Sequence, residues 1–125
     1  MPILAAILGT LIVAAPTQAQ ELKRCPKYEA AIKAAGLPVK TFSYLAWRES
    51  RCNHRSISAI RQSTGRPDVG LFQVQASWAT VTRRICHVKY SEVIKALTRL
   101  DCQLKVAKYL WQDGKGASNW GLPNA

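Results

Sequence analysis

The stretch Tyr44–Asn53 reads Y-L-A-W-R-E-S-R-C-N, and an apolar pattern runs through it. Phe42, Leu45, Ala46 and Glu49 fall at positions i, i+3, i+4 and i+7 of a helix predicted over residues 41–51, so they share one face. The first three are apolar and predict the buried side of the helix. A carboxylate therefore stands where another core residue is expected, and this makes Glu49 the first candidate for chemistry.

A glycine-led turn follows the helix after a polar and basic loop over residues 53–67. The turn lies in residues 68–74, D-V-G-L-F-Q-V, for which we expect an extended or tightly turned chain. Gly70 lets the backbone approach a ligand closely. The Gln73 amide offers both a donor and an acceptor, which suits a sugar hydroxyl or an N-acetyl group.

The rest of the chain predicts further helices and little strand. Helical spacing is present over residues 26–35, 77–85, 90–97 and 100–112, with Ser77 and Asp101 as expected N-terminal caps of the second and fourth of these segments. The fold class is therefore mainly α. The length of 125 residues predicts one small working domain, over residues 20–125.

Residues 1–19 differ in kind from the remainder. They carry no charge, are almost wholly apolar from Ile3 to Ala15, and end in Pro16-Thr17-Gln18-Ala19, small residues of the sort that signal peptidase cuts. The apolar run is shorter than the ~20 residues that a membrane span needs, so no stable span is expected. We interpret it as a signal peptide, with an uncleaved anchor as the alternative. The domain is then exported, to the periplasm or outside the cell.

The cysteines agree with export. An even count, four, in a small exported chain favours disulfides. Three pairings are possible. If the first two predicted helices form an antiparallel hairpin, Cys25 at the start of one meets Cys52 at the end of the other, which leaves Cys86 with Cys102.

The charge limits the partners. A net charge of +11 predicts an anionic partner. Nucleic acid fits poorly with export, and the longest basic tract is Arg83-Arg84, whereas cell-wall polymers carry carboxylates and phosphates. There is no C-x-x-C motif, and His54 and His87 lack ligand spacing, so we expect no metal and no other cofactor.

Glu49 has two interpretations. Tyr44 and Trp47 are close in sequence, and an apolar pocket can raise the pKa of a glutamate from ~4.3 toward ~6. Such a carboxyl can protonate a glycosidic oxygen near neutral pH. In the second interpretation, Glu49 is salt-bridged near a helix end by Arg48 or Arg51.

The two motifs together resemble a known family. Glu49-Ser50 followed by Asn53, and then Gly70-Leu71-Phe72-Gln73-Val74, resemble the E-S…N-P…G-L-M-Q-I pattern of lytic transglycosylases of the soluble, lysozyme-like superfamily. Asp101-Cys102-Gln103-Leu104 is similar to the D-x-x-N-I helix of that family, with glutamine in place of asparagine. The size, the export segment and Asp68 look most like small secreted members or those that accompany secretion and conjugation machines. The chain departs from the pattern at His54, where the family usually has proline.

The resemblance implies a lysozyme-like fold whose groove binds the glycan strands of peptidoglycan. Glu49 would match the single catalytic acid. It would protonate the bond between N-acetylmuramic acid and N-acetylglucosamine, then take the proton of the muramic acid C6 hydroxyl as a 1,6-anhydro ring closes. We expect a monomer that needs no cofactor, with a cell-envelope secretion or conjugation machine as a further partner. The expected substrate contacts, with Ser50 also orienting Glu49, are Ser50, Asp68, Gly70, Gln73, Tyr109 and Trp120.

Two alternatives remain open. In a hydrolytic muramidase, Asp68 would lie across the groove from Glu49, ~6.5–9.5 Å away in an inverting route, and activate water. We favour instead an Asp68 that accepts backbone amides in the turn. The other alternative is a basic, disulfide-linked protein that binds the cell wall, or acts as an antimicrobial, without catalysis.

Overall fold

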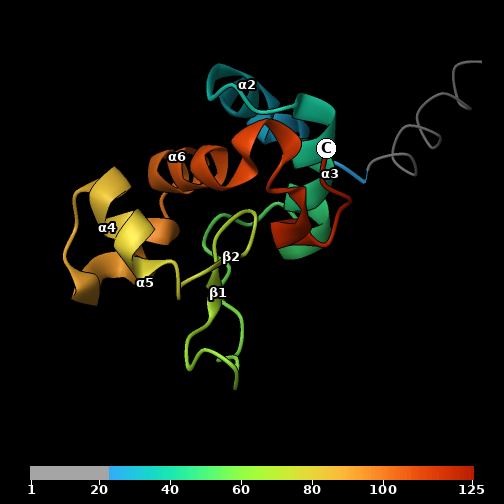
Figure 1. The fold of residues 1–125 in the computed structure, drawn as a ribbon. Coiled ribbons are helices and arrows are strands. Elements are labelled where there is room, and N and C mark those ends of the chain that lie inside the picture. The colour runs from blue at the N-terminus through green and yellow to red at the C-terminus, as the bar shows by residue number, and fades with distance from the viewer. Residues whose placement is uncertain (1–22) are drawn as a thin grey trace, which may run out of the picture.

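The computed structural model describes residues 23–125, so the predicted signal peptide lies outside the described residues. This part of the chain is mainly helical, as expected. Figure 1 shows α6 through its middle, with α2 and α3 toward one end and α4 and α5 toward the other. The helices are α2 (Pro26–Ala34), α3 (Val39–Ser50), α4 (Ala79–Cys86), α5 (Val93–Leu97) and α6 (Leu100–Trp111), with 3-10 turns η1 (Tyr90–Glu92), η2 (Gln112–Gly114) and η3 (Ala117–Trp120). Between residues 23 and 125, no helix combines the length and the apolarity needed to cross a membrane.

Both predicted disulfides are present. Cys25 precedes α2 and Cys52 follows α3, and their Cα atoms lie 5.6 Å apart. Cys86, the last residue of α4, pairs with Cys102 in the first turn of α6. Each disulfide therefore links the ends of two helices, as the hairpin argument requires for the first pair.

The predicted caps are not found where we placed them. α4 begins after Trp78 and α6 after Arg99, and neither helix has a side-chain hydrogen bond at its N-cap. Asp101 lies inside the first turn of α6, where the backbone N–H of Cys102 and then Arg99 lower the pKa of its carboxyl. A carboxylate there still interacts favourably with the helix dipole, which explains its position without a cap.

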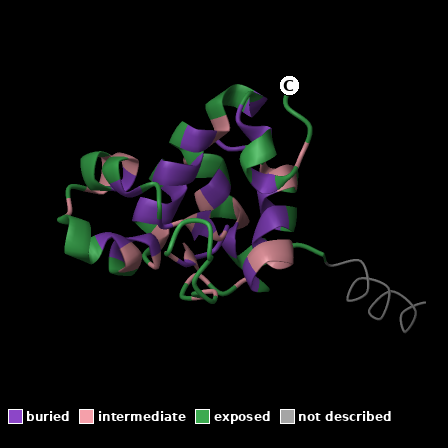
Figure 2. Cartoon of the chain, turned by 60° about the horizontal axis from the view of Figure 1, so that its bottom comes forward, coloured by how far each residue is buried: buried purple, intermediate pink, exposed green. Residues whose placement is uncertain are grey.

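The core is centred on the apolar face of α3. Phe42, Leu45 and Ala46 are fully buried, as their spacing predicted. The Phe42 ring makes edge-to-face contacts with Phe72, Trp111 and Trp120, with centroids 5.1, 5.1 and 5.2 Å away. Figure 2 shows the buried faces turned toward one another. Each such aromatic pair is worth about 1 kcal/mol beyond its buried area, so α3 is joined here to three later segments.

Two short strands enclose a tight turn. β1 (Asp68–Val69) pairs antiparallel with β2 (Val74–Gln75). The turn between them contacts α6 through the fully buried Gln103. The Gln103 amide nitrogen donates to Val69 O at 3.1 Å and Leu97 O at 2.7 Å, and its oxygen accepts from the Phe72 N–H at 2.9 Å. One amide thus satisfies three backbone groups that have no access to water.

Gly70 serves this packing. Its φ is +89°, which glycine adopts without strain. A Cβ at this position would overlap Gln103 Nε2 and Leu97 O. Gly70 was predicted to let the backbone approach a ligand closely. In the structure it lets the backbone approach Gln103 and Leu97 instead.

A polar cluster joins the start of α2 to α3. The Ser43 hydroxyl donates to Glu29 Oε2 at 2.6 Å and accepts from the Cys25 N–H at 2.8 Å. Arg24 also donates to both oxygens of Glu29, at 2.8 and 2.6 Å. The hydrogen bonds from Arg24 and then Ser43 lower the pKa of Glu29 to about 2.

Replacing Gln103 tests the link between turn and helix. Gln103→Leu should lower the free energy of unfolding by about 3 kcal/mol, because it leaves buried backbone groups without partners. Urea unfolding followed by circular dichroism measures the change. Gln62→Leu, at an exposed loop position, is the matched control and should stay within about 0.5 kcal/mol of wild type. Equal stabilities for the two variants would show that the Gln103 hydrogen bonds do not stabilise the fold.

The Glu29 cluster predicts a pH dependence of stability. Because the folded pKa of about 2 lies below the reference value of 4.5, Glu29 stabilises the fold above pH 4.5, and this contribution is lost as the pH falls toward 2. Glu29→Gln should therefore cost about 1 kcal/mol at pH 7, a figure reduced for solvent screening. The difference should vanish near pH 2. Urea unfolding across this pH range measures the difference in stability. The exposed Asp113→Asn is the control, and its difference from wild type should not disappear as the pH falls toward 2.

Candidate functional site

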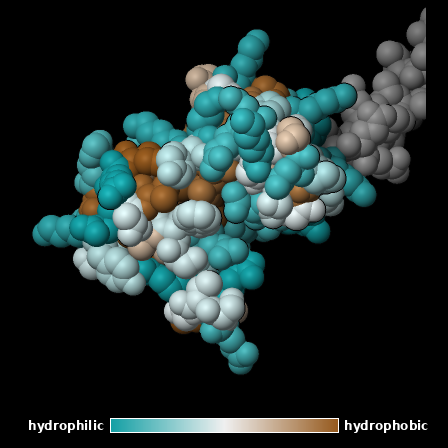
Figure 3. Space-filling view, in the orientation of Figure 1, coloured by the Kyte–Doolittle hydropathy of each residue, from teal (hydrophilic) through white to brown (hydrophobic). Residues whose placement is uncertain are grey.

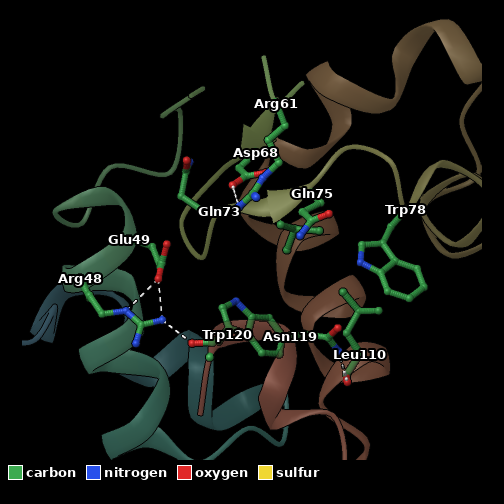
Figure 4. A pocket seen from close by; sticks show the side chains of 12 residues that line it. Arg48, Glu49, Arg61, Asp68, Gln73, Gln75, Trp78, Leu110, Asn119 and Trp120 are labelled. Atoms are coloured by element: carbon green, nitrogen blue, oxygen red, sulfur yellow. Dashed lines mark hydrogen bonds and ion pairs between the residues drawn. The ribbon is translucent and has the colours of Figure 1, made fainter. Parts of the chain in front are cut away.

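A pocket of about 200 Å³ opens between the end of α3, the strand pair and the C-terminal turns (Figure 4). Its wall combines carboxylates, arginines, amides and aromatic rings. The lining residues are Arg48, Glu49, Arg61, Asp68, Gln73, Val74, Gln75, Trp78, Leu110, Asn119, Trp120 and Gly121. The structure thus brings together four residues that the sequence predicted, Glu49, Asp68, Gln73 and Trp120.

Glu49 lies in the last turn of α3, and its side chain is 28% exposed. Its apolar neighbours on the same face are fully buried, so Glu49 stands at the edge of that face, where the face meets the pocket. Arg48 Nε donates to Glu49 Oε2 at 2.8 Å, and Arg48 Nη2 lies 2.6 Å from the same oxygen. Within residues 23–125, the other oxygen, Oε1, has no hydrogen-bond partner. Glu49 is therefore both ion-paired with Arg48 and open to the pocket, so the structure combines features of the two interpretations.

Arg48 also fixes the C-terminal wall of the pocket. Its Nη2 donates to the carbonyl of Trp120 at 2.6 Å. The Trp120 indole N–H donates to Phe72 O at 3.0 Å, and the residue is only 6% exposed. Trp120 is one of the predicted substrate contacts. It lines the pocket, but most of its ring packs in the core.

Asp68 begins β1 and pairs in register with Gln75. Arg61 binds both oxygens of its carboxylate, Nε to Oδ1 and Nη2 to Oδ2, each at 2.8 Å. In the described structure this arginine takes the place that we had assigned to the backbone amides of the turn. The hydrogen bonds that Arg61 donates to Asp68, then the negative charges of Asp68 and Glu49, raise the pKa of Arg61.

Amide side chains provide acceptors in the pocket. Gln73, held at φ +51°, donates through Nε2 to Ser56 O at 3.2 Å and to Gly70 O at 3.1 Å. Asn119 donates through Nδ2 to Leu110 O at 3.2 Å. Two bonds occupy the Gln73 nitrogen, so its carbonyl oxygen is left for a ligand, whereas Asn119 also keeps one N–H in the described structure. Such oxygens accept hydrogen bonds from sugar hydroxyls and N-acetyl N–H groups.

Ser50 has different partners from those expected. It is buried, and its hydroxyl lies 3.0 Å from Ala46 O and 2.8 Å from Leu71 O while accepting from the Asn53 N–H at 3.1 Å. None of these bonds reaches Glu49, and Ser50 does not line the pocket. Its observed bonds attach the end of α3 to the turn.

Tyr109 and Gly70 also lie away from the pocket wall. Tyr109 is 54% exposed on α6 and lines a separate shallow hollow with Val81 and Ile85 of α4. Figure 3 shows hydrophobic residues gathered over α4 and α6. Tyr109, a predicted substrate contact, therefore faces α4 and not the pocket that holds Glu49.

Sequence reasoning did not assign Arg61 to the site. Arg61 belongs to the polar loop before β1, and the bond from its backbone N–H to Arg66 O, at 3.0 Å, closes a turn that brings it back toward the strand. The one available signal was its charge, opposite to that of Asp68. Gln75, Trp78 and Asn119 also line the pocket, and Trp78 is 37% exposed there.

Neither a protein-family model, nor a curated protein, nor a solved structure matches this chain. Among residues 23–125, no three His, Cys, Asp or Glu side chains group together as a metal site would require. The described structure therefore defines the class: a small, mainly helical, disulfide-linked protein with a pocket in which two carboxylates are each paired with an arginine.

Proposed function

We propose that this protein is an exported lytic transglycosylase with a lysozyme-like fold, which cleaves the glycan strands of peptidoglycan. The observation that carries the proposal is Glu49 itself, a carboxylate in a pocket lined by amides and tryptophans, with one oxygen free of protein partners in the described chain. The disulfides support export to an oxidising compartment. The net charge of +11 supports an anionic polymer as the partner.

The first step is general acid catalysis. Arg48 contacts Oε2 of Glu49, so the proton is carried by Oε1, the oxygen left to the pocket. Glu49 donates it to the glycosidic oxygen as the bond between N-acetylmuramic acid and N-acetylglucosamine breaks. The N-acetylglucosamine leaves with a new hydroxyl, and positive charge develops at the muramic acid anomeric carbon.

The second step uses the same residue as a base. Glu49 is now a carboxylate and remains in contact with Arg48. It accepts the proton of the muramic acid C6 hydroxyl while that oxygen bonds to the anomeric carbon and closes a 1,6-anhydro ring. The carboxyl ends protonated and ready for the next cleavage, and no water is consumed.

The partners of Asp68 favour this chemistry over hydrolysis. Arg61 binds both oxygens of Asp68, and these bonds compete with a water molecule that Asp68 would have to hold and deprotonate. The transglycosylase reaction needs only one proton-transferring residue, because the substrate supplies its own nucleophile. Hydrolysis is the second candidate, since Asp68 lines the same pocket as Glu49.

Glu49→Gln tests the acid. The substitution keeps the size of the side chain but removes the transferable proton, so release of soluble fragments from purified peptidoglycan should fall by about 10²–10⁴-fold. Mass spectrometry of wild-type products should show 1,6-anhydro-muramic acid ends. An unchanged thermal melting curve is the control for folding. Equal release by both proteins would exclude Glu49 as the acid, and an absence of release by either, with retained wall binding, would favour the non-enzymatic alternative.

Asp68→Asn separates the two cleavage reactions. We expect anhydro ends to persist, with a rate within about tenfold of wild type, because Asp68 handles no proton. Reducing ends in the wild type, together with a loss of about 10² or more in this variant, would assign hydrolysis. Arg61→Gln removes the same ion pair from its other side. If both variants lose activity equally, the pair shapes the pocket and takes no part in the chemistry.

A further inference from the structure

The outward face of α3 carries a second stripe of side chains. Tyr44, Trp47 and Arg48 fall at i, i+3 and i+4, beside the apolar stripe that enters the core, and Arg51 follows as the C-cap of the helix. The Tyr44 and Trp47 rings lie 6.2 Å apart with an angle of 31° between their planes, and Tyr44 is 38% exposed. This face is therefore a row of aromatic rings and cations that is partly exposed to solvent.

The cations lie over the rings. The Arg51 guanidinium carbon is 4.0 Å from the Trp47 ring centroid, Lys23 Nζ is 5.7 Å from the same centroid, and the Arg48 guanidinium carbon is 5.9 Å from that of Tyr44. We call these five residues the cation–aromatic ladder. A guanidinium stacked on a ring is held in place while its in-plane N–H donors stay directed outward, the arrangement that binds carboxylates bidentately.

Most of this charge is unneutralised in the described structure. Of the ladder cations, only Arg48 is in an ion pair, with Glu49, whereas Lys23 and Arg51 have no acidic partner between residues 23 and 125. Arg51 Nη1 donates to Trp47 O at 3.3 Å, which leaves its other donors. Attraction to the carbonyl end of α3 accounts for Arg51 there. It does not account for Lys23, which comes from outside the helix to the same ring.

The ladder is continuous with the pocket. Arg48 belongs to both, since it contacts the Tyr44 ring on one side and lines the pocket beside Glu49 on the other. A polymer with one sugar at Glu49 therefore reaches the ladder with an adjoining part. Arg51 covers the face of the Trp47 ring, so a sugar cannot stack on that face. A ligand that approaches it meets the Arg51 guanidinium instead.

We propose that the cation–aromatic ladder binds the peptide carboxylates carried by the glycan strand whose sugar occupies the Glu49 pocket. This rests on the proposed function. The muramic acid being cleaved uses its C6 oxygen as the nucleophile, so that oxygen carries no phosphate polymer. Its peptide, attached at another position, remains present with its carboxylates. The net charge of the chain, +11, matches such a polyanion.

Binding to purified, insoluble cell walls tests the ladder without relying on cleavage. In a Glu49→Gln background, Arg51→Gln should bind about tenfold more weakly, because it loses charge-assisted hydrogen bonds. Arg83→Gln removes the same charge from an exposed position on α4 and should bind within about twofold of the background protein. Lys23→Gln, outside all helices, gives a second ladder variant that leaves the α3 cap intact. Thermal melting of each variant checks folding.

Two treatments of the wall identify the ligand. Stripping phosphate polymers should leave the tenfold difference unchanged, whereas removing the stem peptides with an amidase should abolish it. Equal binding by Arg51→Gln and Arg83→Gln would overturn the ladder, and a difference that disappears with the phosphate polymers would overturn the carboxylate assignment. Ladder-dependent binding to a wall that the wild type does not cleave would uphold the ladder and reject the proposed enzyme, so the two failures are distinguishable.

Discussion

The buried amide of Gln103 is the interaction on which the site depends. It satisfies two backbone carbonyls and one backbone N–H at the same time, and Gly70 gives it room. Other segments attach to the same turn: Ser50 from α3 bonds to Leu71 O and Trp120 from η3 bonds to Phe72 O. Because buried backbone groups without partners are costly, the turn has few alternative conformations. The positions of Asp68 and Gln73 at its two ends follow from this.

The two carboxylates of the pocket are held in opposite ways. Glu49 is bound by Arg48 through one oxygen, and Asp68 is bound by Arg61 through both. Both carboxylates line one pocket, but in the described structure only Glu49 keeps an oxygen without a protein partner. Arg48 also ties α3 to the C-terminal turn, so the catalytic proposal and the shape of the pocket depend on the same guanidinium.

Helix α3 accounts for most of what the protein is proposed to do. Its buried stripe forms the core, its last turn presents Glu49 to the pocket, and its outward stripe carries the cation–aromatic ladder. The buried stripe, Glu49 and the cation–aromatic ladder lie on different sides of this one helix. Their positions relative to one another are therefore fixed by the helix. In the proposed function, a glycan strand bound across this helix would meet both Glu49 and a row of cations.

The sequence by itself determined the local features. Helical periodicity predicted the buried face of α3 and put Glu49 on that same stripe, and the cysteine positions relative to the helices predicted both disulfides. Tertiary structure decided the rest. It gave Asp68 an arginine partner from a distant part of its loop, turned Ser50 and Gly70 toward the interior, and left Tyr109 on another surface. The physical reason is that periodicity fixes which side of an element a residue occupies, whereas its partner depends on which segments the core packing brings against that side.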